Sequence, residues 1–137
     1  MAETFDHERL NVYQVALEFV AIADSIVQGL PPGRGYVADQ LQRASTSIVL
    51  NIAEGAGEFS PKEKARFYRM AQRSATECAG LLDVCRTLKV SVEKLLAEGR
   101  TRLLRIVAML VALGLRMIGK KGKKTPSSDS GSGSDGA

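Results

Sequence analysis

Few side chains in this sequence have the types and spacing that catalysis requires. Serine or cysteine nucleophiles need a base beside them, and the sequence has one histidine, His7, in a polar N-terminal segment. Glu18, Glu54 and Glu77 could ligate two metal ions in a helical bundle, but such sites also need Glu-x-x-His pairs. The glycine-containing residues 55–57 lack the Lys-Ser or Lys-Thr pair of a phosphate-binding loop. We therefore expect no enzymatic activity, no cofactor and no metal.

Short polar side chains form a second pattern in residues 40–58, QLQRASTSIVLNIAEGAGE. At 100° per residue they follow one stripe of a helix, beside an apolar arc that includes Leu41 and Ile48. A solvated helix face usually carries many Lys and Glu, so we interpret the stripe as a partly buried hydrogen-bonding network that is architectural. A mildly amphipathic surface stripe is the alternative.

We expect this network to pair with the following helix. If the two helices form a hairpin about Gly57, counting outward places Arg43 near Ser74 and Glu77, which predicts an ion pair between Arg43 and Glu77. The predicted network consists of Gln40, Arg43, Ser47, Asn51, Glu54, Ser74 and Glu77.

Positive charge is the remaining chemical signal. The chain has 19 Lys and Arg against 15 Asp and Glu, which gives a net charge of +4. Four of the cations recur at steps of four, three and four residues, which places them on one helix face, opposite an apolar side. Such a ridge can contact nucleic-acid phosphates without reading sequence; a solvated face with neighbouring acids is the alternative. The candidate nucleic-acid-binding residues are Lys62, Arg66, Arg69 and Arg73.

Four helices must position these groups. The patterns predict them from about Leu10 to Gln28, from Tyr36 or Val37 to Glu54, from Pro61 to Leu88, and from a cap at Ser91 to Ile118. The strongest start signal is Ser60-Pro61 with Glu63 completing a capping box. Short connections favour antiparallel neighbours, so we predict an all-α, antiparallel up-down-up-down four-helix bundle. A three-helix core with the first helix packed on another subunit is the alternative.

The domain organisation follows from composition. We predict an N-terminal segment over residues 1–9, the bundle over residues 10–119 and a disordered Lys/Ser/Gly tail over residues 120–137. The longest apolar run, residues 106–115, is far shorter than the ~20 residues that span a bilayer, and residues 1–9 do not resemble a signal peptide. Cys78 and Cys85 would lie about 10 Å apart on a helix, too far for a disulfide. We expect a cytoplasmic protein without membrane contact.

The first and last predicted helices carry more apolar surface than one core needs. The first has two apolar sides, and the last is apolar almost all round from Leu103 to Ile118. Surplus apolar surface on a short chain favours self-association, and burial on several sides within the chain is the alternative. The expected subunit interface consists of Val15, Phe19, Ile22 and Ile26.

Residues 40–77, QLQRASTSIVLNIAEGAGEFSPKEKARFYRMAQRSATE, resemble the signature of the bacterial four-helix bundle proteins first named for intervening sequences in 23S rRNA genes. The resemblance covers about Phe5 to Ile118, and its most specific part is S-I-x-x-N-I-A-E-G at residues 47–55. The matching positions are Arg43, Ser47, Asn51, Glu54 and Gly55 in the second helix, and Phe67, Ala71, Ser74 and Glu77 in the third.

This resemblance implies an antiparallel four-helix bundle that assembles into a ring, typically a homopentamer. It also implies a distant relationship to the accessory variability determinant of diversity-generating retroelements, a basic pentamer that binds reverse transcriptase and nucleic acid. We therefore predict a non-enzymatic oligomer that associates with RNA or DNA, as an accessory of a reverse transcriptase. The alternative is a ring-shaped protein-interaction scaffold with no nucleic-acid role.

Overall fold

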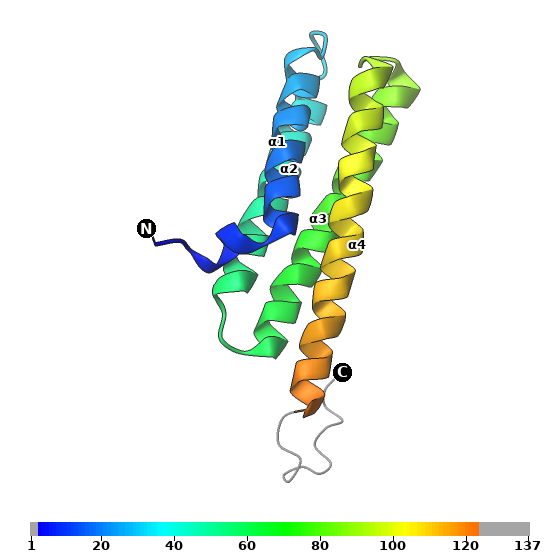
Figure 1. The fold of residues 1–137 in the computed structure, drawn as a ribbon. Coiled ribbons are helices and arrows are strands. Elements are labelled where there is room, and N and C mark those ends of the chain that lie inside the picture. Colours follow the sequence, from blue (N-terminus) through cyan, green and yellow to red (C-terminus); the bar gives the residue numbers. More distant parts are fainter. Residues whose placement is uncertain (1–2, 124–137) are drawn as a thin grey trace.

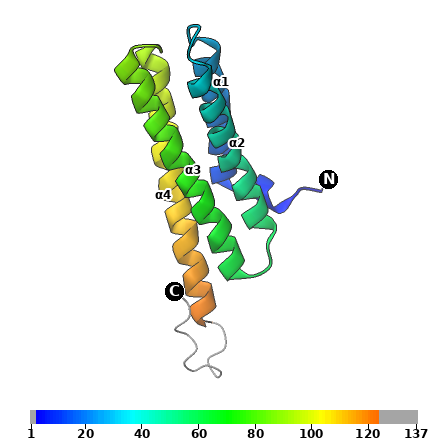
Figure 2. The same cartoon turned by 180° about the vertical axis from the view of Figure 1, so that it is seen from behind.

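The computed structural model describes residues 3–123, which form a bundle of antiparallel helices (Figure 1). A short 3-10 helix, η1 (Asp6–Arg9), precedes α1 (Asn11–Gln28), α2 (Gly35–Gly57), α3 (Pro61–Leu88) and α4 (Glu93–Lys123). Successive α-helices run in opposite directions, and each packs against the helix before and after it while α4 closes against α1. The predicted all-α, up-down-up-down four-helix bundle is therefore confirmed, and Figure 2 shows it from behind.

The start of α3 follows its sequence signal only in part. Ser60 is the N-cap, and its Oγ accepts a hydrogen bond from the backbone N–H of Glu63 at 3.1 Å. The Glu63 carboxylate does not return this bond to Ser60, because it accepts one from Arg66 instead, at 3.0 Å. The helix ends at Lys89, whose φ of 58° and ψ of 42° are left-handed. Half of the predicted capping box is thus formed.

The ends of α2 and α4 differ from the prediction. α2 continues past Glu54 to Gly57. At the start of α4, the carbonyl of Val92 accepts the first bonds, from the N–H groups of Leu95 and Leu96. The predicted cap, Ser91, instead has a buried hydroxyl without a hydrogen-bond partner among the described residues. Because α4 ends at Lys123, residues 120–123 of the predicted tail are helical; the remainder, 124–137, lies outside the described residues.

The core takes side chains from all four α-helices, and it includes most of the residues expected at a subunit interface. Val15, Phe19 and Ile26 are only 4%, 0% and 1% exposed, and Ile22 is partly buried against the core. The prediction that these residues contact a neighbouring subunit is wrong for the three buried ones, because the other helices of the same chain already cover them. On the second apolar side of α1, Leu17 stays exposed.

The remaining sequence expectations concern cysteines and membranes. Cys78 and Cys85 are free and buried. No helix within residues 3–123 is long and apolar enough to cross a membrane.

Candidate nucleic-acid interface

The four predicted nucleic-acid-binding cations lie together on α3. Lys62, Arg66, Arg69 and Arg73 are all exposed. They face away from the buried side of the helix, to which Ala71 and other fully buried residues belong. We call these four residues the α3 ridge.

The ridge cations differ in how free they are to bind an anion. Arg66 is held by the structure: its Nε donates to Glu63 Oε1 at 3.0 Å, and its guanidinium lies 4.6 Å from the centroid of the Phe67 ring. Lys62, Arg69 and Arg73 form no ion pair with any residue in 3–123. Three ridge cations are therefore available to an external anion, and the fourth is partly neutralised.

Lys64 lies on the same helix but has a structural role that was not predicted from the sequence. Its Nζ donates hydrogen bonds to the backbone carbonyls of Gly55 and Ala56, at 3.3 and 2.8 Å. These carbonyls are in the last turn of α2, where the helix dipole favours a cation. The Gly55 carbonyl also accepts a hydrogen bond from the backbone N–H of Glu58, at 3.2 Å. A lysine shortly after a predicted helix end is the signal that could have shown this role.

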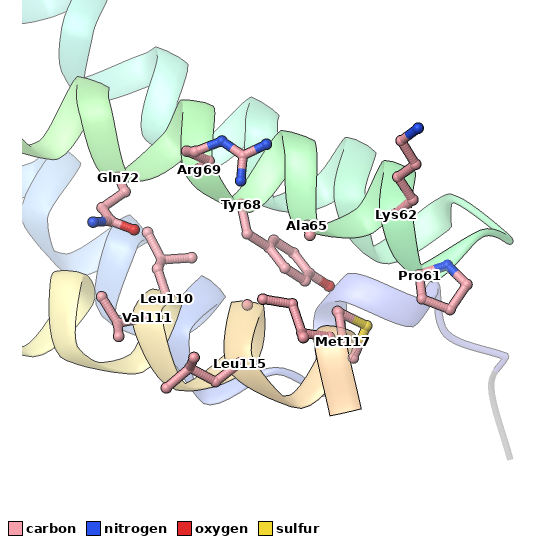
Figure 3. A pocket seen from close by; sticks show the side chains of 12 residues that line it. Pro61, Lys62, Ala65, Tyr68, Arg69, Gln72, Leu110, Val111, Leu115 and Met117 are labelled. Carbon is pink, nitrogen blue, oxygen red and sulfur yellow. The ribbon is translucent and has the colours of Figure 1, made fainter. Parts of the chain in front are cut away.

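A groove between α3 and α4 adjoins the ridge (Figure 3). Its volume is about 270 Å³, and its apolar lining includes Ala65 and Tyr68 from α3 and Leu115 from α4. The Tyr68 ring points from α3 toward α4, whereas Lys62 extends away from α4 and Arg69 lies along α3 at the edge of the groove. Burial raises the pKa of Tyr68, although the nearby positive charge of Arg116 acts in the opposite direction. The groove was not predicted from the sequence.

Three members of the predicted polar network meet between α2 and α3. The hydroxyls of Ser47 and Ser74 share a hydrogen bond of 2.9 Å. The Asn51 Nδ2 donates to the backbone carbonyl of Ser47 and to its hydroxyl, both at 3.0 Å. All three side chains are partly buried. Of these bonds, the one between Ser47 and Ser74 attaches α2 to α3, whereas both Asn51 bonds lie within α2.

The other members of the network do not join it. Gln40 is partly buried, and its side chain makes no hydrogen bond to the described residues; Arg43, Glu54 and Glu77 are exposed. The predicted ion pair between Arg43 and Glu77 is not formed, since no side-chain nitrogen and oxygen of the two lie within 4.0 Å. Both groups are exposed to solvent, where an ion pair gains little. That part of the network prediction is wrong.

The carboxylates considered for a metal site are dispersed. Glu18 accepts a hydrogen bond from Arg102 Nε at 2.9 Å and so links α1 to α4. Within the described part of the chain, no group of three His, Cys, Asp or Glu side chains lies close enough together to hold a metal ion.

Comparison with protein families identifies a matching family. The model of the family described as 23S rRNA-intervening sequence protein matches residues 8–112. This range contains α1, α2 and α3, much of α4, the α3 ridge and the whole predicted polar network. Among curated proteins, no sequence matches the chain.

Proposed function

We propose a function on the basis that this chain belongs to the 23S rRNA-intervening sequence protein family, whose model matches well over half of it. In this proposal the protein is a non-enzymatic, self-associating helical bundle that binds nucleic acid through the α3 ridge. One observation carries the proposal: Lys62, Arg69 and Arg73 are exposed on one line of a helix and form no ion pair within residues 3–123.

The ridge suits the phosphate backbone and not the bases. Arg73 lies eleven positions after Lys62, so the ridge extends about 16 Å along α3, a length that covers several phosphates of one strand. Binding cations to phosphates releases condensed counterions, which favours association and makes it depend steeply on salt. The ridge itself consists only of Lys and Arg at an exposed helix surface, so we expect binding that depends little on sequence.

Self-association would strengthen such a weak site. One ridge offers three free cations, but an oligomer repeats it in every subunit, and linked sites bind far more tightly than one site alone. The homopentamer predicted from the resemblance is part of this proposal. Association with a reverse transcriptase, and the distant relationship to the accessory variability determinant, stay predictions of the resemblance. The absence of enzymatic activity also stays a prediction, although the matched family is described by an rRNA sequence and not by a reaction.

The test compares two double variants with the same change in charge. Arg69→Glu/Arg73→Glu reverses two ridge cations, and Arg9→Glu/Lys94→Glu reverses two exposed cations elsewhere. Binding of fluorescent single-stranded RNA and duplex DNA is measured by anisotropy over a range of salt concentrations. If two phosphate contacts are lost, the slope of log K against log salt on duplex DNA should become less steep by about 1.8, and all sequences should be weakened alike.

Two results would refute the ridge as a nucleic-acid site. One is a wild-type protein that retains neither RNA nor DNA at low salt. The other is a control double variant that loses as much affinity as the ridge variant, because binding would then follow net charge alone. In either case the scaffold without a nucleic-acid role becomes the better account, and the exposed apolar residues of α4 favour it.

A further inference from the structure

The groove between α3 and α4 combines an apolar lining with positive charge that no acid of the chain neutralises (Figure 3). On its α4 edge, Val111, Leu115 and Ile118 are 41%, 64% and 51% exposed. On its α3 edge lie Lys62 and Arg69, and neither forms an ion pair within residues 3–123. Among the described residues that line the groove, none is an Asp or Glu. The groove therefore offers apolar contact along one edge and positive charge along the other.

The groove also has free space at Gly114 of α4. This glycine belongs to the lining, and a Cβ added to it would meet no neighbouring atom within 4 Å. An apolar side chain from outside the bundle therefore has room to lie beside the α4 backbone.

The dimensions of the groove favour a helix as its occupant. The lining extends from Pro61 to Gln72 on α3 and from Leu110 to Ile118 on α4, so the groove is about 12 to 16 Å long and follows both helices. Its volume of about 270 Å³ is below the ~300–1,000 Å³ of pockets that enclose a small ligand. A long apolar groove of this kind can receive the apolar face of an amphipathic helix.

The cations determine which charge such a helix must carry. Lys62 and Arg69 are seven positions apart on α3, and Arg73 continues the α3 ridge four positions further. The three residues are therefore spaced by about 10.5 Å and then by about 6 Å along the helix axis. A helix that lies alongside α3 matches these intervals with carboxylates at positions i, i+7 and i+11, or at i, i+4 and i+11 if it runs in the opposite direction.

We propose that this groove binds an acidic amphipathic helix of a protein partner, whose apolar face packs into the groove and whose carboxylates meet Lys62, Arg69 and Arg73. The inference goes beyond the proposed function, because its ligand is a protein segment and its binding requires no nucleic acid. Since the helix and a phosphate backbone use the same cations, the partner and nucleic acid should exclude each other.

Other occupants fit the groove less well. A nucleobase needs an exposed aromatic ring on which to stack, and Tyr68 is only 4% exposed. Residues 124–137 of this chain include no Leu, Ile, Val, Met or aromatic residue that could fill an apolar groove. A second copy that placed its own groove against this one would bring Lys62 and Arg69 of both copies together, and like charges oppose association.

The test uses a fluorescent helical peptide of about 18 residues, with a stripe of Leu beside Glu at positions i, i+4, i+7 and i+11, which suits either helix direction. A control peptide carries Lys in place of each Glu. Binding to the full-length protein is measured by anisotropy in the absence of nucleic acid. We expect the Glu peptide to bind and the Lys peptide to bind at least about tenfold more weakly, because several exposed ion pairs are replaced by like-charge pairs.

Two variants separate the apolar contact from the charge contact. Gly114→Leu fills the groove and should weaken binding of the Glu peptide by roughly 10- to 150-fold, which is the loss of one buried leucine side chain. Gly119→Leu is the matched control, because Gly119 is exposed on α4, outside the lining, and an added Cβ there also meets no neighbouring atom within 4 Å. Lys62→Glu/Arg69→Glu should reverse the preference, so that the Lys peptide binds more tightly than the Glu peptide, a result that misfolding cannot produce.

Several outcomes would overturn the inference. A wild-type protein that binds neither peptide, or both equally, does not recognise an acidic helix. If Gly114→Leu binds the Glu peptide as tightly as Gly119→Leu does, the peptide lies outside the groove. If light scattering shows that Gly114→Leu alone changes the mass of the protein, the groove is a contact between copies of the chain. Displacement of the peptide by phosphatidylglycerol vesicles would assign the groove to a membrane surface, and simultaneous binding of RNA and peptide would show that the peptide does not use the ridge cations.

This experiment and the test of the ridge fail independently. Gly114→Leu should bind RNA like the wild type, because it leaves every cation of the α3 ridge in place. A protein that binds the Glu peptide but retains no nucleic acid would refute the ridge as a nucleic-acid site and leave the helix-binding groove intact. A protein that binds RNA but not the Glu peptide would refute the groove and leave the ridge intact.

Discussion

Substitution of Gly55 by alanine should reveal how closely α2 and α3 approach each other. A Cβ added at Gly55 would lie 2.8 Å from Tyr68 Cε1, 3.0 Å from Tyr68 Cδ1 and 3.1 Å from Phe67 Cβ. The shortest distance is about 0.7 Å less than a normal carbon–carbon contact. Tyr68 is only 4% exposed, so its ring can make room for the added methyl group only by shifting toward the groove that it lines or by displacing its neighbours in the core.

The expected magnitude follows from two opposing contributions. Replacing glycine by alanine within a helix stabilises the helix by about 1 kcal/mol. Forcing an extra methyl group into a packed core destabilises the protein by about 1 to 3 kcal/mol. Gly80 provides a matched control, because it is also within a helix, α3, and an added Cβ there has no atom within 4 Å. Gly80→Ala should therefore stabilise the protein, and Gly55→Ala should be less stable than Gly80→Ala by about 1 to 3 kcal/mol.

The assay is urea unfolding followed by circular dichroism, at one fixed protein concentration because self-association would change the midpoint. A second pair of measurements in a Tyr68→Leu background completes a double-mutant cycle. Without the Tyr68 ring, Gly55→Ala should lower the free energy of unfolding by a smaller amount. If Gly55→Ala is as stable as Gly80→Ala, or if its cost is the same without the ring, the proposed contact between Gly55 and Tyr68 is refuted.

Two further predictions concern single side chains. Ser74→Ala should reduce the free energy of unfolding by about 0.5 to 1.5 kcal/mol, the net worth of one hydrogen bond, whereas Thr46→Ala, at an exposed hydroxyl of α2, should have little effect; equal effects would contradict a specific Ser47–Ser74 bond. Burial, and to a smaller extent the charge of Glu77, raises the pKa of Cys78 from 9.0 to about 12. The protonated Cys78 thiol therefore contributes its full stabilisation of the folded state below pH 9, and this contribution is lost as the pH rises toward 12. A plot of stability against pH should be flatter in this range for Cys78→Ala, and an unchanged plot would contradict the burial of the thiol.

Much of the bundle could be predicted because local signals suffice for it. Proline and glycine mark the connections, and the Ser60-Pro61 start of α3 lies where the sequence places it. Ser47, Asn51 and Ser74 could be recognised because short hydrogen-bonding side chains are unusual on a solvated helix face. The same periodicity put the four cations of the ridge on one side of α3, where they are exposed.

Other features could not be predicted because they depend on which helices are neighbours. Periodicity showed that α1 has two apolar sides, but it could not show that α2 and α4 cover the side with Val15 and Phe19. The prediction of the Arg43–Glu77 ion pair was wrong for a related reason. Counting residues outward from the turn between two helices shows which residues lie at the same level, but it does not show whether their side chains point toward each other. The groove beside Tyr68 also requires two helices, because α3 and α4 each supply part of its lining.

The motif at residues 47–55 connects these observations through two contacts between α2 and α3. Ser47 joins the two helices through its hydrogen bond to Ser74, and Asn51, also in α2, donates to the same Ser47 hydroxyl. Gly55 allows α3 to approach until the Tyr68 ring lies against the α2 backbone. Tyr68 also lines the groove between α3 and α4. Displacing Tyr68 would therefore change the groove without altering any residue of α4. The motif therefore has an architectural effect on the proposed nucleic-acid-binding surface, because it sets the position of the helix that carries the ridge.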